Sequence, residues 1–318
     1  MIVRPYFLGV DGGGTKTEFV CIDAVGSVVA RAVTGTTYHL EVGLDEAVIR
    51  LEQGIAAICA ELGITPAGFG YVFFGLPAYG EDSAIDPQLN AACGRLLGHD
   101  RYVSGNDMVC GWAGSLGAED GINIVAGTGS IGYGEYHGRG ARIGGWGEIF
   151  GDEGSAYWIA IQGLALFSRM SDGRAPKSLL HGIIIDALAL REDLDLCQRI
   201  MGPTAMGRGQ IAALAGLVSR AAAEGDDAAH DILRSAAREL AALAIGLRAV
   251  LRFPDGVRVP LSWSGGVLSQ EPLVRDAFAA QIEGTGIFEL IEPRHAPGYG
   301  AALYARKLAS IRNNTSRS

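Results

Sequence analysis

The chain has few cysteines, and their spacing forms no recognisable pattern. There are five in 318 residues, and no two have the CxxC spacing of zinc sites and redox motifs. They are Cys21, Cys59, Cys93, Cys110 and Cys197. Four stand in apolar stretches, where a reduced thiol packs as a small apolar side chain. The sequence therefore indicates neither a disulfide framework nor a zinc site.

Excess positive charge and long apolar runs are also lacking. Lys and Arg number 26 against 35 Asp and Glu, which gives a net charge of −9. Because a phosphate backbone would be repelled overall, we expect no nucleic-acid partner. No apolar run reaches the roughly 18 residues of a membrane span, and the first residues lack the apolar core of a signal peptide. We therefore expect a cytoplasmic protein that does not interact with membranes.

Two familiar nucleotide motifs are missing from the glycine-rich stretch FLGVDGGGTKTEFVCID, residues 7–23. It contains no GxxxxGK[ST], and a strand rather than a helix follows the glycines, unlike in a dinucleotide fingerprint. What it does contain is an acid followed by glycines and two polar residues: Asp11, Gly12, Gly13, Gly14, Thr15 and Lys16. These residues fit either a glycine-rich hairpin turn or a loop whose backbone N–H groups converge on a phosphate. Asp11, at the end of a strand, is well placed to orient a metal-bound water.

The order of apolar segments indicates α/β layers. Apolar residues make up 48% of the chain, enough for sizeable cores. We expect strands at 5–10, 17–23, 27–34 and 71–76, helices at 44–62, 86–97, 209–224 and 227–251, and a closing helix at 297–311. The stretch INIVAGTGSIGYGEY, residues 122–136, repeats the opening pattern of strand, glycine turn and strand, so two related halves are expected. The predicted domains are 1–118 and 119–296, with helix 297–311 packing back on the first.

Two further glycine runs follow predicted strands. The first contains Gly127, Thr128, Gly129 and Ser130, and the second contains Gly265 and Gly266. The first could be a second phosphate loop, and the second could let an adenine ring lie on the backbone. Ordinary turns between elements are the alternative for both.

Two other stretches carry candidate substrate residues. SGND, residues 104–107, ends a predicted strand at the sheet edge where ligands bind in α/β proteins. Asp107 could accept a proton from a substrate hydroxyl, or it could cap the following helix. GGWGEIFGDEGSAYWIA, residues 144–160, combines glycine turns, carboxylates and Trp146, as suits a polyhydroxylated ligand. A structural loop with a packed tryptophan is the alternative.

These stretches, in this order, resemble the sugar kinase, Hsp70 and actin superfamily, and within it the BadF/BadG-type ATPase and N-acetylglucosamine kinase family. GVDGGGTKTE is similar to the first phosphate motif, VAGTGS to the second and SGGV to the adenosine motif. Residues 144–160 are close to the corresponding segment of N-acetylglucosamine kinases. The resemblance spans residues 5 to 308. It implies two actin-like (ribonuclease H-like) domains with a nucleotide cleft between them, and a homodimer.

The resemblance also implies a role for each matched residue. Asp107 would be the catalytic base, and ATP with Mg²⁺ would bind the three glycine runs, with Asp11 holding the metal through water. The sugar contacts would be His39, Asn106, Asp107, Gly145, Trp146 and Asp152. Three positions depart from the kinase pattern, namely Tyr38, Pro77 and Ile131, which places the identity of the sugar in question.

The function expected from this resemblance is the ATP-dependent phosphorylation of an amino sugar. The first candidate is N-acetylglucosamine, with its 6-phosphate as the product. Glucosamine kinase or a related hexose kinase is the second possibility, since the sugar contacts are altered. An ATPase activator of the BadF type without a sugar substrate is the third, and a non-catalytic sugar sensor the fourth. The iron–sulfur activators of the family need cysteines near a subunit interface, and no such pattern is found here.

Overall fold

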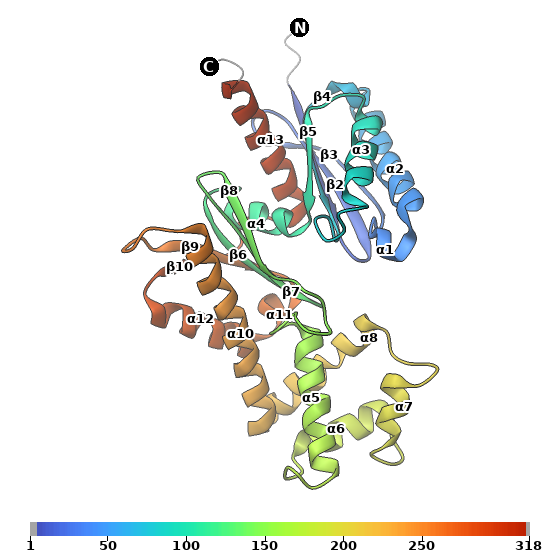
Figure 1. Ribbon diagram of the computed structural model, residues 1–318, viewed down its shortest axis with the longest axis vertical. Helices are drawn as coiled ribbons and strands as arrows, with labels where there is room; N and C mark the ends of the chain where they lie inside the picture. Colours follow the sequence, from blue (N-terminus) through green and yellow to red (C-terminus); the bar gives the residue numbers. More distant parts are fainter. Residues whose placement is uncertain (1–4, 316–318) are drawn as a thin grey trace. The chain divides into compact units, whose positions relative to one another are not determined.

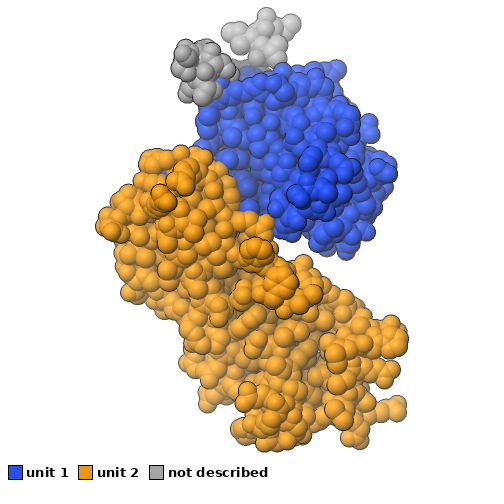
Figure 2. All heavy atoms as spheres, in the orientation of Figure 1, with its two compact units in different colours: residues 1–120, 292–318 blue, residues 121–291 orange. Residues whose placement is uncertain are grey.

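The computed structural model describes residues 5–315. The chain divides into two compact units, residues 1–120 with 292–318, and residues 121–291 (Figure 2). We refer to them as unit 1 and unit 2. The first segment of unit 1 ends at Asp120, close to the domain boundary at 118 that the sequence predicts.

Unit 1 is built on a five-stranded sheet of order β3-β2-β1-β4-β5. Strands β1, β2 and β3 form an antiparallel meander, and β4 and β5 run parallel to β1. Its elements are β1 (Tyr6–Gly12), β2 (Lys16–Ile22), β3 (Val28–Gly35), α1 (His39–Val42), α2 (Leu44–Leu62), η1 (Pro66–Gly68), β4 (Phe69–Leu76), α3 (Asp86–Leu97), β5 (Tyr102–Asn106), α4 (Met108–Leu116) and α13 (Pro297–Thr315).

The two faces of this sheet are covered by different helices (Figure 1). Side chains alternate along β1, so Leu8 and Val10 enter the core shared with α2 and α3, while Gly9 lies on the other face. A Cβ on Gly9 would stand 2.1 Å from the backbone nitrogen of Ala302, which shows how closely α13 approaches β1. The last helix of the chain is thus packed on the first strand.

Unit 2 repeats this topology with a five-stranded sheet of order β10-β9-β6-β7-β8. Strands β6, β7 and β8 form the meander, and β9 and β10 are the parallel additions. Its elements are β6 (Gly121–Ala126), β7 (Ser130–Tyr136), β8 (Arg139–Gly144), α5 (Ala156–Ser171), α6 (Leu179–Leu188), α7 (Asp195–Met201), α8 (Arg208–Ala213), α9 (Ala215–Ala223), α10 (Asp227–Leu251), β9 (Val259–Ser264), α11 (Gly266–Gln270), α12 (Pro272–Thr285) and β10 (Phe288–Leu290). The meander followed by parallel strands in both units confirms the predicted repeat and the α/β fold class.

Two parts of unit 2 differ from the sequence prediction. The amphipathic segment predicted at 209–224 is helical but forms two helices, because α8 and α9 meet at Leu214, where hydrogen bonds of the tighter 3₁₀ type interrupt the α-helix. Strand β8 was not expected, since its sequence RGARIG has few apolar residues. An edge strand with little burial does not need apolar alternation.

Two local findings complete the description of the fold. Within the described residues, none of the helices is both long and apolar enough to span a bilayer.

In unit 1, α13 is held by aromatic contacts. The Tyr304 ring is nearly perpendicular to the rings of Phe73 and Trp112, at centroid distances of 5.0 and 5.5 Å.

Candidate functional site

The parallel strands of unit 1 bring two aspartates to one edge of the sheet. Asp11 pairs in register with Gly75 of β4, and Gly75 pairs with Gly105 of β5. Asp107 follows β5 directly, so both carboxylates lie at the carboxyl ends of neighbouring parallel strands. This is the edge where ligands bind in open α/β sheets.

The two carboxyl groups have unusual proton affinities. Burial raises the pKa of Asp107 to about 7, and the negative charges of Asp11 and Glu81 add to the rise. Burial also raises the pKa of Asp11 to about 6, although the hydrogen bond from the Cys110 thiol opposes that rise. Near neutral pH, Asp107 is therefore close to half protonated, which is the condition that favours a general base.

The helix-cap interpretation of Asp107 is wrong. Its side chain makes no capping hydrogen bond to α4, and its backbone is already helical. Asn106 is used instead, since its Oδ1 accepts from the Met108 N–H at 3.1 Å and its Nδ2 donates to the Tyr79 carbonyl at 3.2 Å. The amide of Asn106 therefore stabilises the turn that presents Asp107.

The first glycine loop is held by its own backbone and by the loop after β3. The Gly13 N–H donates to the Lys16 carbonyl at 2.8 Å, and the Thr36 hydroxyl donates to the Gly13 carbonyl at 2.7 Å. Among the described residues, the N–H groups of Gly14 and Thr15 donate no hydrogen bond. These N–H groups are available to a phosphate oxygen.

Close packing around Gly12 brings the first glycine loop against the segments that follow β3 and β4. A Cβ there would stand 2.7 Å from the ring of Pro77 and 2.7 Å from the hydroxyl oxygen of Thr37. No side chain fits, so this glycine is needed for the approach. Pro77, one of the departures from the kinase pattern, is thus a neighbour of the first loop.

His39 begins α1 and is buried. Neither ring nitrogen has a hydrogen-bond partner among the described residues. The Tyr38 ring lies steeply inclined to the imidazole, at 76°, with the centroids 6.3 Å apart. A buried imidazole without a partner is costly, and a ligand hydroxyl would relieve that cost.

In unit 2, the N-terminus of α5 fixes the second glycine loop. The carbonyls of Gly127 and Thr128 accept from the N–H groups of Ala156 and Tyr157 at 2.9 and 3.3 Å. The Ser130 hydroxyl donates to the Glu153 carbonyl at 2.7 Å. Within the described part of the chain, the N–H groups of Thr128 and Gly129 donate to no other group. The carbonyls of this loop are therefore satisfied, while two of its donors remain open.

The third glycine run lies beside the second. Gly265 has a φ of +91°, and a Cβ there would stand 2.4 Å from the Ala126 carbonyl oxygen. Gly266 opens α11 with no atom near its missing side chain. Since β6 and β9 are paired in parallel, both runs stand at the same edge of the second sheet.

The segment 144–155 has both exposed and buried candidates. Trp146 is 71% exposed, and Gly145 packs against Ile131, another departure from the kinase pattern. Asp152 is buried, and its Oδ2 accepts a 2.6 Å hydrogen bond from Nη2 of Arg208. Nε of Arg208 also pairs with Oε2 of Glu148 at 3.1 Å. The predicted sugar residue Asp152 therefore has a cationic partner that sequence analysis missed.

The predicted residues thus form two groups. Unit 1 holds residues 11–16, His39, Asn106 and Asp107, and unit 2 holds residues 127–130, Gly145, Trp146, Asp152, Gly265 and Gly266. Sequence reasoning missed Thr36, Cys110 and Arg208. None stands in a glycine run or in an acidic motif, so no local pattern identified them.

The donor set around Asp11 is compatible with Mg²⁺ carried by a nucleotide. Among the described residues, no three His, Cys, Asp or Glu side chains are grouped to hold a metal ion. Mg²⁺ commonly binds through one or two carboxylates, with phosphates and waters as its other ligands. A carboxylate beside a phosphate loop fits that pattern.

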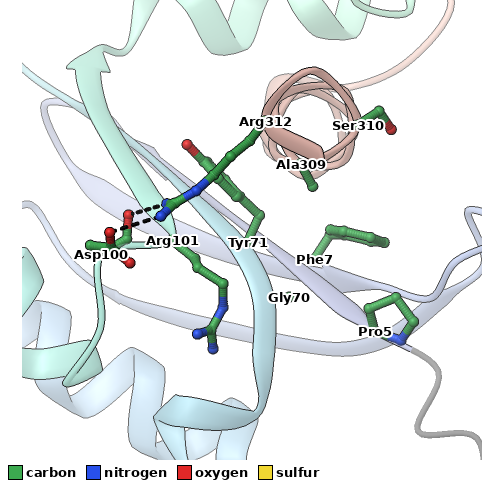
Figure 3. Close-up of a pocket in the computed structure, with 9 residues that line it drawn as sticks. All are labelled: Pro5, Phe7, Gly70, Tyr71, Asp100, Arg101, Ala309, Ser310 and Arg312. Atoms are coloured by element: carbon green, nitrogen blue, oxygen red, sulfur yellow. Dashed lines mark hydrogen bonds and ion pairs between the residues drawn. The ribbon is translucent and has the colours of Figure 1, made fainter. Parts of the chain in front are cut away.

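A separate pocket of about 320 Å³ lies in unit 1 (Figure 3). Phe7 and Tyr71, near the first residues of β1 and β4, line it together with Ser310 of α13 and the ion pair between Arg312 and Asp100. It therefore lies near the opposite ends of the strands from Asp11. None of the predicted site residues lines it.

Comparisons with known proteins show the family to which the chain belongs. The chain matches the BadF/BadG/BcrA/BcrD ATPase family over residues 8–305. It is 31% identical over 305 residues to the N-acetylmuramic acid/N-acetylglucosamine kinase of Clostridium acetobutylicum, covering 95% of this chain and 98% of that protein. It is 29% identical over 314 residues to the N-acetyl-D-glucosamine kinase of Dictyostelium discoideum, with the same two coverages, 95% and 98%.

A solved structure shows the same fold. It is a candidate N-acetylglucosamine kinase from Chromobacterium violaceum, with a TM-score of 0.72 and 25% identity, and the match covers 95% of this chain and 99% of that one. Since the family match extends over nearly the whole length, the chain belongs to the BadF/BadG/BcrA/BcrD ATPase family.

Proposed function

We propose that this protein is an ATP-dependent amino-sugar kinase that transfers a phosphoryl group to the 6-hydroxyl of N-acetylglucosamine. The family is one of ATPases, and the relatives of nearly equal length are named as kinases of N-acetylglucosamine. The observation that carries the proposal is Asp107. It lies at the ligand-binding edge of the first sheet, does not cap a helix, and has a pKa of about 7.

In the proposed reaction, the Asp107 carboxylate accepts the proton of the sugar hydroxyl as its oxygen attacks the γ-phosphorus of ATP. The bond from that phosphorus to the bridging oxygen breaks, and ADP leaves. In each unit, open N–H groups of the glycine loop are available to phosphate oxygens, at Gly14 and Thr15 in unit 1 and at Thr128 and Gly129 in unit 2. Because the transition state is loose, positioning and charge stabilisation supply most of the rate.

Asp11 is assigned to the metal side of this reaction. Mg²⁺, when bound with ATP, neutralises charge on the phosphate oxygens. Asp11 would hold a water of that ion, since its carboxylate lies beside the first loop. With Asp11→Asn, we expect weaker ATP binding in the presence of Mg²⁺ than for the unsubstituted protein.

Glucosamine kinase is retained as a second candidate because of the sugar contacts. Pro77 and Ile131 offer no side-chain hydrogen bond and pack against Gly12 and Gly145. The BadF-type activator is less well supported, because four of the five thiols are buried and only Cys197 is exposed. Location in the cytoplasm and a homodimer are further parts of the proposal.

The experiment is a panel of sugars offered to the purified full-length chain with ATP and Mg²⁺. N-acetylglucosamine, N-acetylmuramic acid, glucosamine and glucose are compared by ADP release and by mass spectrometry of the product. We expect the largest kcat/KM for N-acetylglucosamine. A preference for glucosamine would favour the second candidate, and ATP hydrolysis without a sugar phosphate would contradict the kinase assignment.

A further inference from the structure

Arg208 lies where three functional features of unit 2 meet. Its Nη2 donates to Asp152 at 2.6 Å, and its Nε pairs with Glu148 at 3.1 Å. A Cβ on Gly129 would stand 2.7 Å from Nη2 of Arg208 and 2.7 Å from Oδ2 of Asp152. The ion pair therefore rests directly against the second glycine loop.

The Asp152 carboxylate needs such a partner. Its side chain is only 4% exposed, and a buried carboxylate is stable only when it is paired and hydrogen-bonded. The backbone of Asp152 is also unusual, because its φ of +56° is uncommon for a residue other than glycine. A residue held in a sparsely populated conformation indicates a constraint that the surrounding structure maintains.

The pairing with Arg208 leaves one carboxylate oxygen unused. Oδ2 accepts from the guanidinium, whereas no described residue donates a hydrogen bond to Oδ1. Fixing one oxygen sets the direction of the other. A sugar hydroxyl that donates to Oδ1 would be held next to the loop that binds phosphate.

Arg208 belongs to α8, in the helical part of unit 2 for which sequence analysis predicted no function. Another ion pair in this part is different: Arg220 of α9 pairs at 2.8 Å with Glu224, the residue after that helix, and both side chains are well exposed. Exposed pairs of that kind contribute little. The Arg208 pair instead joins α8 to the segment 144–155 and shields a buried charge.

We propose that Arg208 is a positioning residue that orients Asp152 for the sugar, so that α8 forms part of the sugar site. This inference rests on the proposed amino-sugar kinase activity. It adds that the affinity for the sugar depends on Arg208, whereas the affinity for ATP does not.

The test is a double-mutant cycle in the full-length protein. The variants are Arg208→Gln, Asp152→Asn, the two combined, and Arg208→Lys, with Arg220→Gln as the matched control. KM for N-acetylglucosamine and for ATP is measured for each, with the dissociation constant of the sugar by calorimetry and the melting temperature.

We expect Arg208→Gln to raise the sugar KM roughly 10- to 100-fold, the range of one charge-assisted hydrogen bond, with the ATP KM unchanged. The melting temperature should fall, because the buried Asp152 carboxylate loses its cationic partner. Arg208→Lys restores part of the affinity, because it keeps the charge but not the planar fork. The double variant is no worse than Asp152→Asn alone, since Arg208 acts through that carboxylate. Arg220→Gln behaves as the unsubstituted protein.

Three outcomes would overturn the inference. They are an unchanged sugar KM in both Arg208 variants, effects that add in the double variant, or an ATP KM that rises together with the sugar KM. If Arg208→Gln fails to fold, the Arg208→Lys comparison decides. Unsubstituted protein that phosphorylates no sugar would defeat the proposed function as well, whereas an active parent with unaffected variants defeats this inference alone.

Discussion

At the scale of single residues, the site depends on charges that lie close to Asp107. Burial is the main cause of its raised pKa, and the charges of Asp11 and Glu81 raise it further. Only the deprotonated carboxylate can act as a base. The rate of phosphoryl transfer should therefore rise with pH through the region near pH 7.

Replacing Glu81 should move this pH profile. Glu81→Gln removes a negative charge that favours the protonated form of Asp107, so the pKa of Asp107 falls and the acid limb of kcat/KM shifts to lower pH. The measurement is kcat/KM for the sugar as a function of pH. Glu52→Gln, on the exposed face of α2, is the control and should leave the profile in place. An acid limb that shifts to higher pH in Glu81→Gln would contradict the account.

The same raised pKa makes a prediction about stability. The folded protein binds the Asp107 proton more tightly than the unfolded chain, whose carboxyl titrates near 3.8. The contribution of this group is therefore favourable at low pH and is lost as pH rises from about 4 to about 7. Asn cannot ionise, so Asp107→Asn escapes that loss.

We therefore expect the free energy of unfolding of Asp107→Asn, relative to the parent, to increase between about pH 4 and pH 7. Urea denaturation at several pH values measures this difference. A difference that is constant or decreases with pH would show that Asp107 is not destabilised by burial. Such a gain on removing a functional carboxylate is the usual exchange of stability for activity.

At the scale of elements, the packing of α13 on unit 1 depends on glycines. A Cβ on Gly300 would stand 2.1 Å from the backbone nitrogen of Gly114 in α4 and 2.6 Å from the carbonyl oxygen of Cys110. Backbone atoms cannot give way as a flexible side chain can. The crossing of α4 and α13 therefore requires glycine at both positions.

Gly300→Ala should destabilise the protein by about 1–3 kcal/mol or more, because the added methyl group forces the two helices apart. Gly182→Ala is the matched control, since Gly182 lies within α6 with open space around it. There, alanine should stabilise by about 0.5–1 kcal/mol through its better helix propensity. Thermal unfolding of both variants checks the pair, and equal effects would contradict the packing described here.

Some helices and turns could be predicted from the sequence, and others could not. Apolar periodicity predicted α2, α3 and α10, since each has a clear buried face, and the glycine runs predicted the turns at 11–15 and 126–130. Strand β8 was missed because an edge strand needs no apolar alternation. The break at Leu214 was missed because its residue type is common within helices.

The site was predictable to a different degree. Asp107 and Asp11 could be placed, because strand ends in a parallel sheet meet at one edge. The pairing of Asp152 with Arg208 could not, since the two are distant in sequence and only the packing of the helical part of unit 2 joins them. The same holds for Cys110, a buried residue of α4 whose thiol donates to the Val10 carbonyl at 3.6 Å and opposes the rise in the pKa of Asp11.

At the scale of the whole molecule, the chain repeats one topology in two units. Unit 2 is one segment of the chain, whereas unit 1 is made of two. Unit 2 is a single continuous segment with its own hydrophobic core. Unit 1 needs α13, which comes from the far end of the chain and covers one face of its sheet. Residues 121–291 produced alone should therefore unfold cooperatively, as an independent domain does.

Residues 1–120 alone should not fold in this way, because the face of β1 and β4 that α13 covers would be open to water. Joining residues 292–318 to that segment through a flexible linker should restore a cooperative transition. Circular dichroism with urea denaturation compares the three polypeptides. A cooperative transition of equal midpoint with and without 292–318 would show that α13 is dispensable.

The central claim, that the protein is a sugar kinase with Asp107 as its base, is tested most directly by phosphoryl transfer in Asp107→Asn. The variant keeps the shape of the side chain but cannot accept the proton, and a general base contributes about 10²–10⁴-fold. We predict that kcat for N-acetylglucosamine phosphorylation falls by roughly that factor, with ATP affinity unchanged. A turnover near that of the parent protein would contradict the account.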